Sequence, residues 1–232
     1  MSKLCFDYGH SGSDSGAVYK GRKEKDDNLK LGLAVAKEVR RHGVKVDETR
    51  TGDKTISLSA RSSFERREKY DYFISFHRNA FKPEAASGVE TFTYTNQTAK
   101  ARSLASRIQK NLVGVGFTDR GVKKANFHVL RETNSPAVLI EVGFIDNTKD
   151  NGIFDAKFNE IVKAITTAIL DEVGVKYKPV NSSSSKPTSP INNKETYYRV
   201  MAGSFKDRGN AKAQIEKLKK AGFDATIMIF NK

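Results

Sequence analysis

The short apolar run Tyr72-Phe-Ile-Ser-Phe76, which ends directly in His77, constrains the fold of this chain more than any other feature. The run is too brief and too aromatic for a helix, so it predicts a buried strand. A strand that ends in His77 and Asn79 is a common way for an α/β sheet to direct polar side chains into the crevice at its carboxyl edge. A single histidine is more often structural, so its interpretation depends on a partner elsewhere in the chain.

Further apolar runs alternate with segments of helical periodicity. Besides the run before His77, we expect strands at 4–7, 44–46, 88–94 and 137–144, with a short apolar strand at 127–130. Helices are expected at 58–69, 99–113 and 158–173, and another that Asp26 or Asp27 caps and Gly43 ends. This alternation predicts an α/β fold in which a mostly parallel sheet is flanked by helices.

The composition changes after residue 177. Residues 178–195 contain prolines and a serine run, which is typical of a linker. Beyond the linker, expected strands at 197–203 and 225–230 flank a helix at 210–221, which makes one small β-α-β unit. We therefore expect a larger domain at 1–177, a linker at 178–195 and a small unit at 196–232.

The formal net charge of +14 indicates an anionic partner. Nucleic acid is not expected, because the chain lacks zinc-finger cysteine pairs, an RNA-binding signature and aromatic–basic alternation. An anionic polymer of the bacterial cell wall would suit the charge equally well. No apolar run approaches the ~20 residues that span a membrane, and the N-terminus lacks the pattern of a secretory signal. We expect a chain made in the cytoplasm without membrane insertion.

Three residues stand at comparable places, each at the end of an expected strand or the entrance of a helix: His10, Glu24 and His77. Two histidines and a glutamate are a complete protein ligand set for catalytic zinc, with a fourth position left for water. Glu24, however, lies in a charged run, and such runs are usually solvated faces. From spacing alone, Asp26 and Asp27 are equal competitors for its place.

Glu141 lies inside the apolar run 137–144. A carboxylate there is costly to bury unless it has a partner or a chemical task. Desolvation would raise its pKa, although a nearby zinc ion would oppose that. Such a group suits proton transfer from the attacking water to a leaving amine. The alternative is a structural anchor paired with an arginine such as Arg131.

The order and spacing of these motifs resemble the zinc-dependent N-acetylmuramoyl-L-alanine amidases of the Amidase_3 family, over residues 2–173. The shared segments are Asp7–Ala17, Glu24 with Asn28-Leu29, Thr49-Arg50 with Asp53, Leu58 and Arg61, Ser75–Ala80, Gly88–Glu90 and Val129–Asn147. The resemblance implies one Zn²⁺ held by His10, Glu24 and His77, which selects Glu24 over its two competitors, and Glu141 as the catalytic carboxylate. Arg78 and Asn79, which adjoin His77, and His128, which borders the expected site, are the candidates for contact with substrate.

The implied reaction is hydrolysis, by zinc-activated water, of the amide between N-acetylmuramic acid and L-alanine in peptidoglycan. Residues 120–131 look especially like amidases of sporulating mother cells and of phages of spore-forming bacteria. We therefore expect an endolysin or an autolysin that acts on the wall after release, by a holin or by mother-cell lysis. Two alternatives stay open: a non-catalytic wall-binding protein with a decayed site, and a zinc peptidase acting on stem peptides.

The chain departs from the family pattern at four positions. Tyr8 and Ser15 stand where prolines are usual, Ser11 where glycine is usual, and Arg78 where a small or neutral residue is common. None of these changes removes a ligand. They bear on the rigidity of the loop and on substrate preference.

The tail resembles one sporulation-related (SPOR) repeat, a peptidoglycan-binding module that normally contains two such units in one four-stranded sheet. A single unit leaves exposed sheet edges, so we expect a homodimer that rebuilds the module. Lysines on the tail helix are the candidates for contact with the anionic wall: Lys212, Lys217, Lys219 and Lys220. The alternative for these lysines is a merely solvated helix face.

Overall fold

The computed structural model of the protein describes residues 2–179, 205 and 207–220. The chain divides into two compact units, Met1–Val180 and Asn181–Lys232. None of the described helices combines the length and apolarity needed to cross a membrane.

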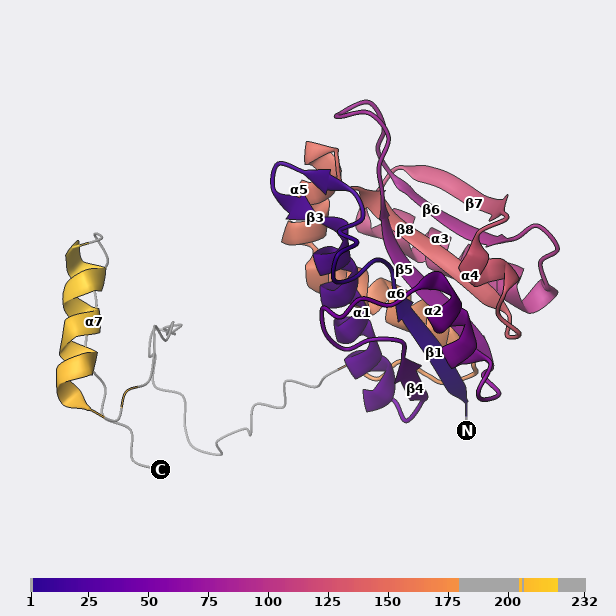
Figure 1. Ribbon diagram of the computed structural model, residues 1–232, viewed down its shortest axis with the longest axis horizontal. Helices are drawn as coiled ribbons and strands as arrows, with labels where there is room; N and C mark the ends of the chain where they lie inside the picture. Colours follow the sequence, from indigo (N-terminus) through magenta and orange to yellow (C-terminus); the bar gives the residue numbers. More distant parts are fainter. Residues whose placement is uncertain (1, 180–204, 206, 221–232) are drawn as a thin grey trace, which may run out of the picture. The chain divides into compact units, whose positions relative to one another are not determined.

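A six-stranded sheet forms the centre of the first unit, in the order β4-β1-β5-β8-β6-β7 (Figure 1). Its strands are β1 Lys3–Tyr8, β4 Lys45–Glu48, β5 Tyr72–Asn79, β6 Val89–Tyr94, β7 Asp119–Ala125 and β8 Ala137–Phe144. Strands β4, β1, β5 and β8 are parallel to one another, β6 is antiparallel to β8, and β7 is parallel to β6. The predicted α/β fold with a mostly parallel sheet is confirmed.

Helices cover both faces of this sheet (Figure 1). Helices α1 (Glu24–Arg41), α3 (Ala99–Val115) and α6 (Phe158–Glu172) contribute to the larger core, and α2 (Leu58–Glu65) and α4 (His128–Arg131) to a smaller cluster on the other face. Helix α5 (Thr148–Ala156) follows β8, and a two-stranded hairpin, β2 (Val18–Tyr19) and β3 (Arg22–Lys23), precedes α1.

Successive side chains of β5 point to alternate faces of the sheet. Ile74 and Phe76 belong to the larger core, whereas Phe73 belongs to the smaller cluster. Because side chains alternate along a strand, Ser75 and His77 point to the same face as Phe73, and Arg78 points to the opposite face. His77 therefore lies beyond the smaller apolar cluster, at the carboxyl end of the sheet.

Several elements differ from the prediction. Residues 127–130 were expected as an apolar strand, but residues 128–131 form the helix α4, and β7 and α5 were not predicted at all. Helix α1 begins at Glu24, so Asp26 and Asp27 lie in its first turn instead of capping it. There they still stabilise the helix, because negative charge is favourable near a helix N-terminus. Helix α2 ends at Glu65, four residues earlier than predicted, and Ser57 caps it by accepting a hydrogen bond from the amide of Ala60.

The second unit contains one described helix, α7 (Arg208–Lys220), where a helix was predicted. The predicted strands at 197–203 and 225–230 lie outside the described residues. On α7, Ala211, Ile215 and Leu218 lie at helical spacing, form one apolar stripe and are half-buried, and all four candidate lysines are exposed.

Candidate active site

His10, Glu24 and His77 meet at the carboxyl end of the sheet. His77 lies near the end of β5, His10 follows β1, and Glu24 is the first residue of α1. Glu24 Oε2 lies 3.1 Å from His10 Nε2, and Glu24 Oε1 lies 2.9 Å from His77 Nδ1. One ligand atom from each residue lies within 4.8 Å of the other two, so the three side chains have the spacing and donor types of a metal site.

The buried position of Glu24 separates it from its competitors. Glu24 is 4 % exposed, whereas Asp26 is exposed. Asp27 is paired with Arg22 and Arg78. Burial alone would raise the pKa of Glu24, but hydrogen bonds and charge from His10 and His77 outweigh it and hold that pKa well below its usual range. Glu24 is therefore an ionised acceptor for a cation, not part of a solvated face.

Two glycines let the backbone approach these ligands closely. A Cβ atom at Gly9 would lie 2.1 Å from Cε1 of His77. At Gly16, where φ is +63°, a Cβ would lie 2.6 Å from both Glu24 Oε2 and His10 Cδ2. His10 itself has a φ of 58°, an uncommon conformation for a non-glycine residue. The loop after β1 is thus shaped around the three side chains.

Buried arginines hold this loop in place. Arg50 donates to the carbonyl oxygens of Tyr8 and Gly9 over 2.8 and 3.1 Å. Arg61 donates to the carbonyl oxygen of His10 over 3.1 Å and forms a buried ion pair of 2.7 Å with Asp7. Both arginines appeared in the sequence only as part of the family resemblance, and their support of the loop was not predicted.

Asp14 was also missed from the sequence. Its Oδ2 lies 2.8 Å from Nδ1 of His10 and leaves Nε2 of that ring facing Glu24. A carboxylate on the second ring nitrogen fixes the tautomer and orientation of a metal-binding histidine. The signal was present, since Asp14 follows His10 by four residues in the same loop.

Glu141 lies in a row of polar residues across the sheet. It is the register partner of His77 in β5 and of Glu90 in β6. Paired residues on neighbouring strands point to the same face, so the three side chains lie side by side. Among the described residues, the buried Oε2 of Glu141 has no hydrogen-bond partner.

The surroundings of Glu141 favour its protonated form. Burial raises its pKa well above the usual range, and the charges of Glu24 and Glu90 add to this. Arg131, the partner suggested for a structural role, instead bonds to Glu132 and Asn126. The structural-anchor interpretation with Arg131 is therefore wrong.

The other candidates for substrate contact are placed differently from one another. The Arg78 side chain is 0 % exposed and its guanidinium bonds to Asp27 and Asn151, which contradicts the predicted substrate-binding role. It fails because His77 and Arg78 are adjacent in a strand and so face opposite sides. Asn79 donates to Glu90 over 2.5 Å, and Nε2 of His128 lies 3.2 Å from Oγ of Ser62. Substrate contact by these two residues stays a prediction.

The remaining departures from the family pattern stabilise the loop. Tyr8 is a core residue whose hydroxyl donates to Glu48 over 2.5 Å. Oγ of Ser11 accepts from the amide of Ile56, and Oγ of Ser15 donates to the carbonyl oxygen of Gly16. These groups bond within the protein, so they act on the rigidity of the loop.

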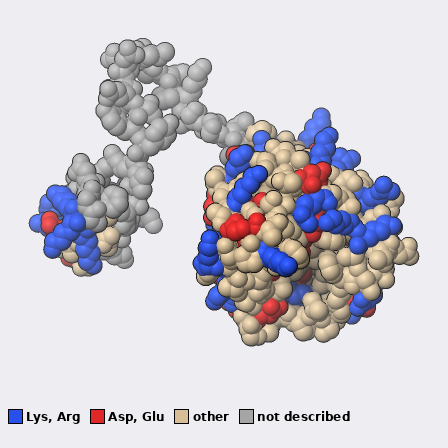
Figure 2. Space-filling model, turned by 90° about the horizontal axis from the view of Figure 1, so that it is seen from above, with Lys and Arg blue, Asp and Glu red and all other residues tan. Residues whose placement is uncertain are grey.

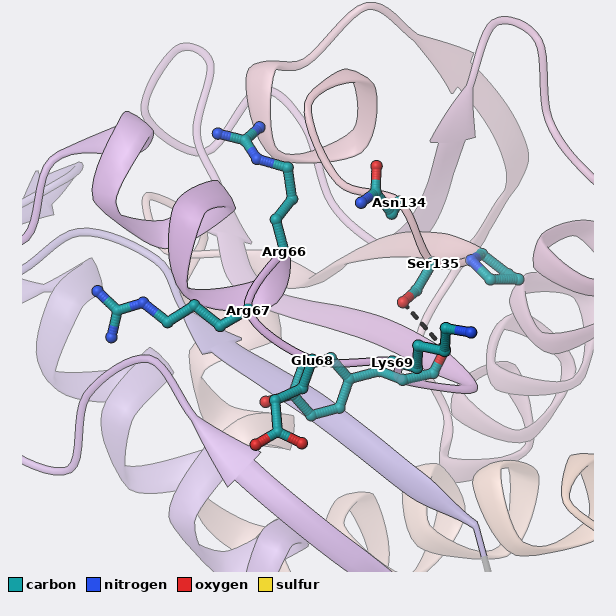
Figure 3. A pocket seen from close by; sticks show the side chains of 8 residues that line it. Arg66, Arg67, Glu68, Lys69, Asn134 and Ser135 are labelled. Atoms are coloured by element: carbon teal, nitrogen blue, oxygen red, sulfur yellow. Dashed lines mark hydrogen bonds between the residues drawn. The ribbon is translucent and has the colours of Figure 1, made fainter.

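A surface pocket lies away from these residues, at the other end of the sheet (Figure 3). It is lined by residues 66–70, which precede β5, and by Asn134, Ser135 and Pro136, which precede β8. Within it, Ser135 Oγ donates to the carbonyl oxygen of Tyr70 over 3.0 Å. None of the predicted site residues lines this pocket.

Comparisons with known proteins agree with the fold and identify the family. The family model described as N-acetylmuramoyl-L-alanine amidase, Amidase_3, matches residues 4–171, and a SPOR domain model matches residues 176–228. The chain is 31 % identical over 232 residues to a sporulation-specific N-acetylmuramoyl-L-alanine amidase of Bacillus subtilis, covering 99 % of this chain and 85 % of that relative. It is 35 % identical over 204 residues to an endolysin of Bacillus phage SPP1, covering 84 % and 74 %.

A solved structure shows the same fold at similar identity. The catalytic domain of CwlV, an N-acetylmuramoyl-L-alanine amidase from Bacillus (Paenibacillus) polymyxa var. colistinus, superimposes with a TM-score of 0.70 at 34 % identity. The match covers 76 % of this chain and 100 % of that domain.

The fold, the family match and the relatives define a hydrolase of the bacterial wall, and the histidine–glutamate cluster is its candidate metal site. The chain belongs to the Amidase_3 family of N-acetylmuramoyl-L-alanine amidases and carries a SPOR domain in its C-terminal part. It is a peptidoglycan amidase, of a family that is zinc-dependent. The alternatives of a decayed, non-catalytic site and of a stem-peptide peptidase are thereby set aside.

Proposed function

We propose that His10, Glu24 and His77 hold one Zn²⁺ and that Glu141 carries the proton during hydrolysis of the amide between N-acetylmuramic acid and L-alanine. The donor set supports this, because two imidazoles and one carboxylate within 4.8 Å of one another suit zinc in a catalytic site. When bound, the metal supplies a Lewis acid that activates the attacking water and polarises the scissile carbonyl.

The observation that carries the proposal is the unpaired carboxyl oxygen of Glu141, buried one strand away from His77. An unpartnered buried carboxyl is costly, so its retention indicates a chemical task. A bound cation would oppose the rise in the pKa of Glu141 and favour its ionised form. Oε2 of the carboxylate would then take a proton from the attacking water as the new C–O bond forms. It returns that proton to the amine of L-alanine as the C–N bond breaks, because a base that accepts a proton early is the acid that donates it later.

We further propose that the enzyme lyses bacterial walls after its release, as a phage endolysin or a mother-cell autolysin. Relatives named for each role support this, since both match most of the chain. The tail adds a second contact with peptidoglycan, in which exposed lysines of α7 face the anionic wall: Lys212, Lys217, Lys219 and Lys220. The domain limits of 1–177, 178–195 and 196–232 belong to the same proposal.

The test uses purified peptidoglycan and chemical labelling of newly formed ends. The wild-type chain should release free N-terminal L-alanine and no new reducing sugar. Release of other N-terminal amino acids would indicate a peptidase, and release of reducing ends a glycosidase. Either result, or no release at all, contradicts the proposed function.

A further inference from the structure

A buried carboxylate beside Glu141 holds two basic side chains at the edge of the active site. Glu90 is 5 % exposed, and its Oε1 accepts from Asn79, two residues beyond His77. Its Oε2 accepts from Nε of Arg120 over 3.0 Å and from Nζ of Lys123. Burial would raise the pKa of Glu90, but Lys123 and Arg120 outweigh it and lower that pKa.

A bulge in β7 brings these two basic residues to one face. Arg120 and Lys123 are three positions apart, so in a regular strand they would point to opposite faces of the sheet. Gly121 has a φ of 83°, and the register between β6 and β7 shifts between Val89 and Thr91. The extra residue in β7 turns the side chains on one side of the bulge to the other face of the sheet, a common effect of a bulge next to an active site. Both side chains consequently reach the same oxygen of Glu90.

The arrangement leaves positive charge facing solvent. Two cations meet one carboxylate, so one positive charge remains in excess. The side chains of Arg120 and Lys123 are 34 % and 40 % exposed, and Arg120 is further held over the ring of Phe144 at 4.9 Å. Lys and Arg side chains are numerous on the face of this unit seen from above (Figure 2). Such fixed, partly exposed donors suit recognition of an anion.

The positions of Arg120 and Lys123 suit contact with the stem peptide of a substrate bound at the active site. Strands β8, β6 and β7 are consecutive in the sheet, so β7 lies about 10 Å from β8 at the usual strand spacing. The stem peptide extends about 3.5 Å per residue from the scissile amide. The side chains of Arg120 and Lys123 shorten the remaining distance between the peptide and the backbone of β7. The first carboxylate beyond L-alanine is the free α-carboxylate of the γ-linked D-glutamate.

We propose that Arg120 and Lys123, positioned by Glu90, form a subsite for this α-carboxylate of the second stem residue. The subsite rests on the proposed function, because it requires the stem peptide to leave the scissile amide toward β7. It makes the enzyme prefer walls in which this carboxylate is free over walls in which it is amidated.

The test compares two peptidoglycans freed of teichoic acid, one with D-isoglutamate and one with D-isoglutamine as the second stem residue. The wild-type chain should hydrolyse the first with a kcat/KM at least ~10-fold higher, which corresponds to about 1.4 kcal/mol. In Arg120→Gln and Lys123→Gln this ratio should fall toward one. Lys124→Gln is the matched control, since Lys124 is an exposed cation on the same strand that does not bond to Glu90, and its ratio should equal that of the wild type.

Other outcomes overturn the subsite in distinct ways. Equal wild-type rates on both walls, or equal losses on both walls in the variants, would leave the amidase function standing and remove the subsite. An effect of the variants that appears only when teichoic acid is left on the wall would assign the basic pair to wall phosphates instead. Hydrolysis of neither wall by the wild-type chain would contradict the proposed function itself.

Discussion

Nη1 of Arg78 lies 2.7 Å from Oδ2 of Asp27, in a buried ion pair between β5 and the first turn of α1. Arg78 is adjacent to His77, and Asp27 lies one helical turn after Glu24, so the pair joins the two elements that carry these ligands. Asp27 also pairs with Arg22 over 2.6 Å, and the guanidinium of Arg78 lies 4.2 Å from the ring centre of Phe154. These contacts fix the separation of β5 and α1 on the face of the sheet opposite the active site.

Loss of Asp27 should destabilise the protein more than loss of Arg78. Burial lowers the pKa of Arg78 to about 10, although the charge of Asp27 opposes this. Asp27→Asn leaves that buried cation without its counter-charge, at a cost of about 3–5 kcal/mol. Arg78→Met removes the cation, while Asp27 keeps Arg22, so its cost should be smaller. Urea unfolding of both variants measures the order, and an equal or reversed order would contradict this account.

His10→Ala and His77→Ala should each lose bound zinc and wall hydrolysis together, because two remaining ligands bind the metal weakly. Metal analysis after dialysis and turbidity of a wall suspension measure the two quantities. His42→Ala is the control, since His42 caps the far end of α1 and should keep both. A variant of His10 or His77 with full zinc and full activity would remove the ligand assignment.

Glu141→Gln should keep zinc but lose catalysis. The amide has the shape of the carboxyl group but cannot carry the proton, so kcat should fall by ~10²-fold or more. Zinc content of the same preparation distinguishes the roles. Loss of metal would make Glu141 a ligand, and near-normal turnover would make it structural.

The metal-free protein should reveal the energetic cost of Glu141. Because burial raises its pKa in the folded chain, the folded state holds this proton at pH values where the unfolded chain has released it. The contribution of Glu141 to stability is therefore complete below its unfolded pKa of about 4.3 and falls as the pH rises above it. Metal-free Glu141→Gln should gain stability over metal-free wild type, with a gap that widens from pH 4 upward. A gap independent of pH in thermal unfolding would contradict this.

The sequence predicted the candidate metal ligands better than the residues that hold them in place. His10 and His77 were predictable because each lies at the end of an apolar run that predicts a strand, and Glu24 because of the family spacing. The predicted substrate role of Arg78 is wrong because side chains alternate along β5, so Arg78 faces away from His77 and is buried against Asp27. Strand β7 was missed because its residues are mostly polar and a bulge at Gly121 breaks their alternation. The row from His77 to Glu90 depends on the register of three strands, which no local pattern contains.

The tail should associate into a homodimer that pairs the sheet edges of the two copies and covers the apolar stripe of α7. Ala211, Ile215 and Leu218 are half-buried on a helix without a fully buried residue, and a single SPOR-like repeat leaves this stripe incompletely covered. Two copies related by a twofold axis would cover it reciprocally. Ile215→Glu places a charge in that contact and should give a monomer, whereas Lys217→Glu changes an exposed position and should leave the dimer intact. Sedimentation velocity at micromolar concentration measures this, and a wild-type chain that sediments as a monomer would contradict the prediction.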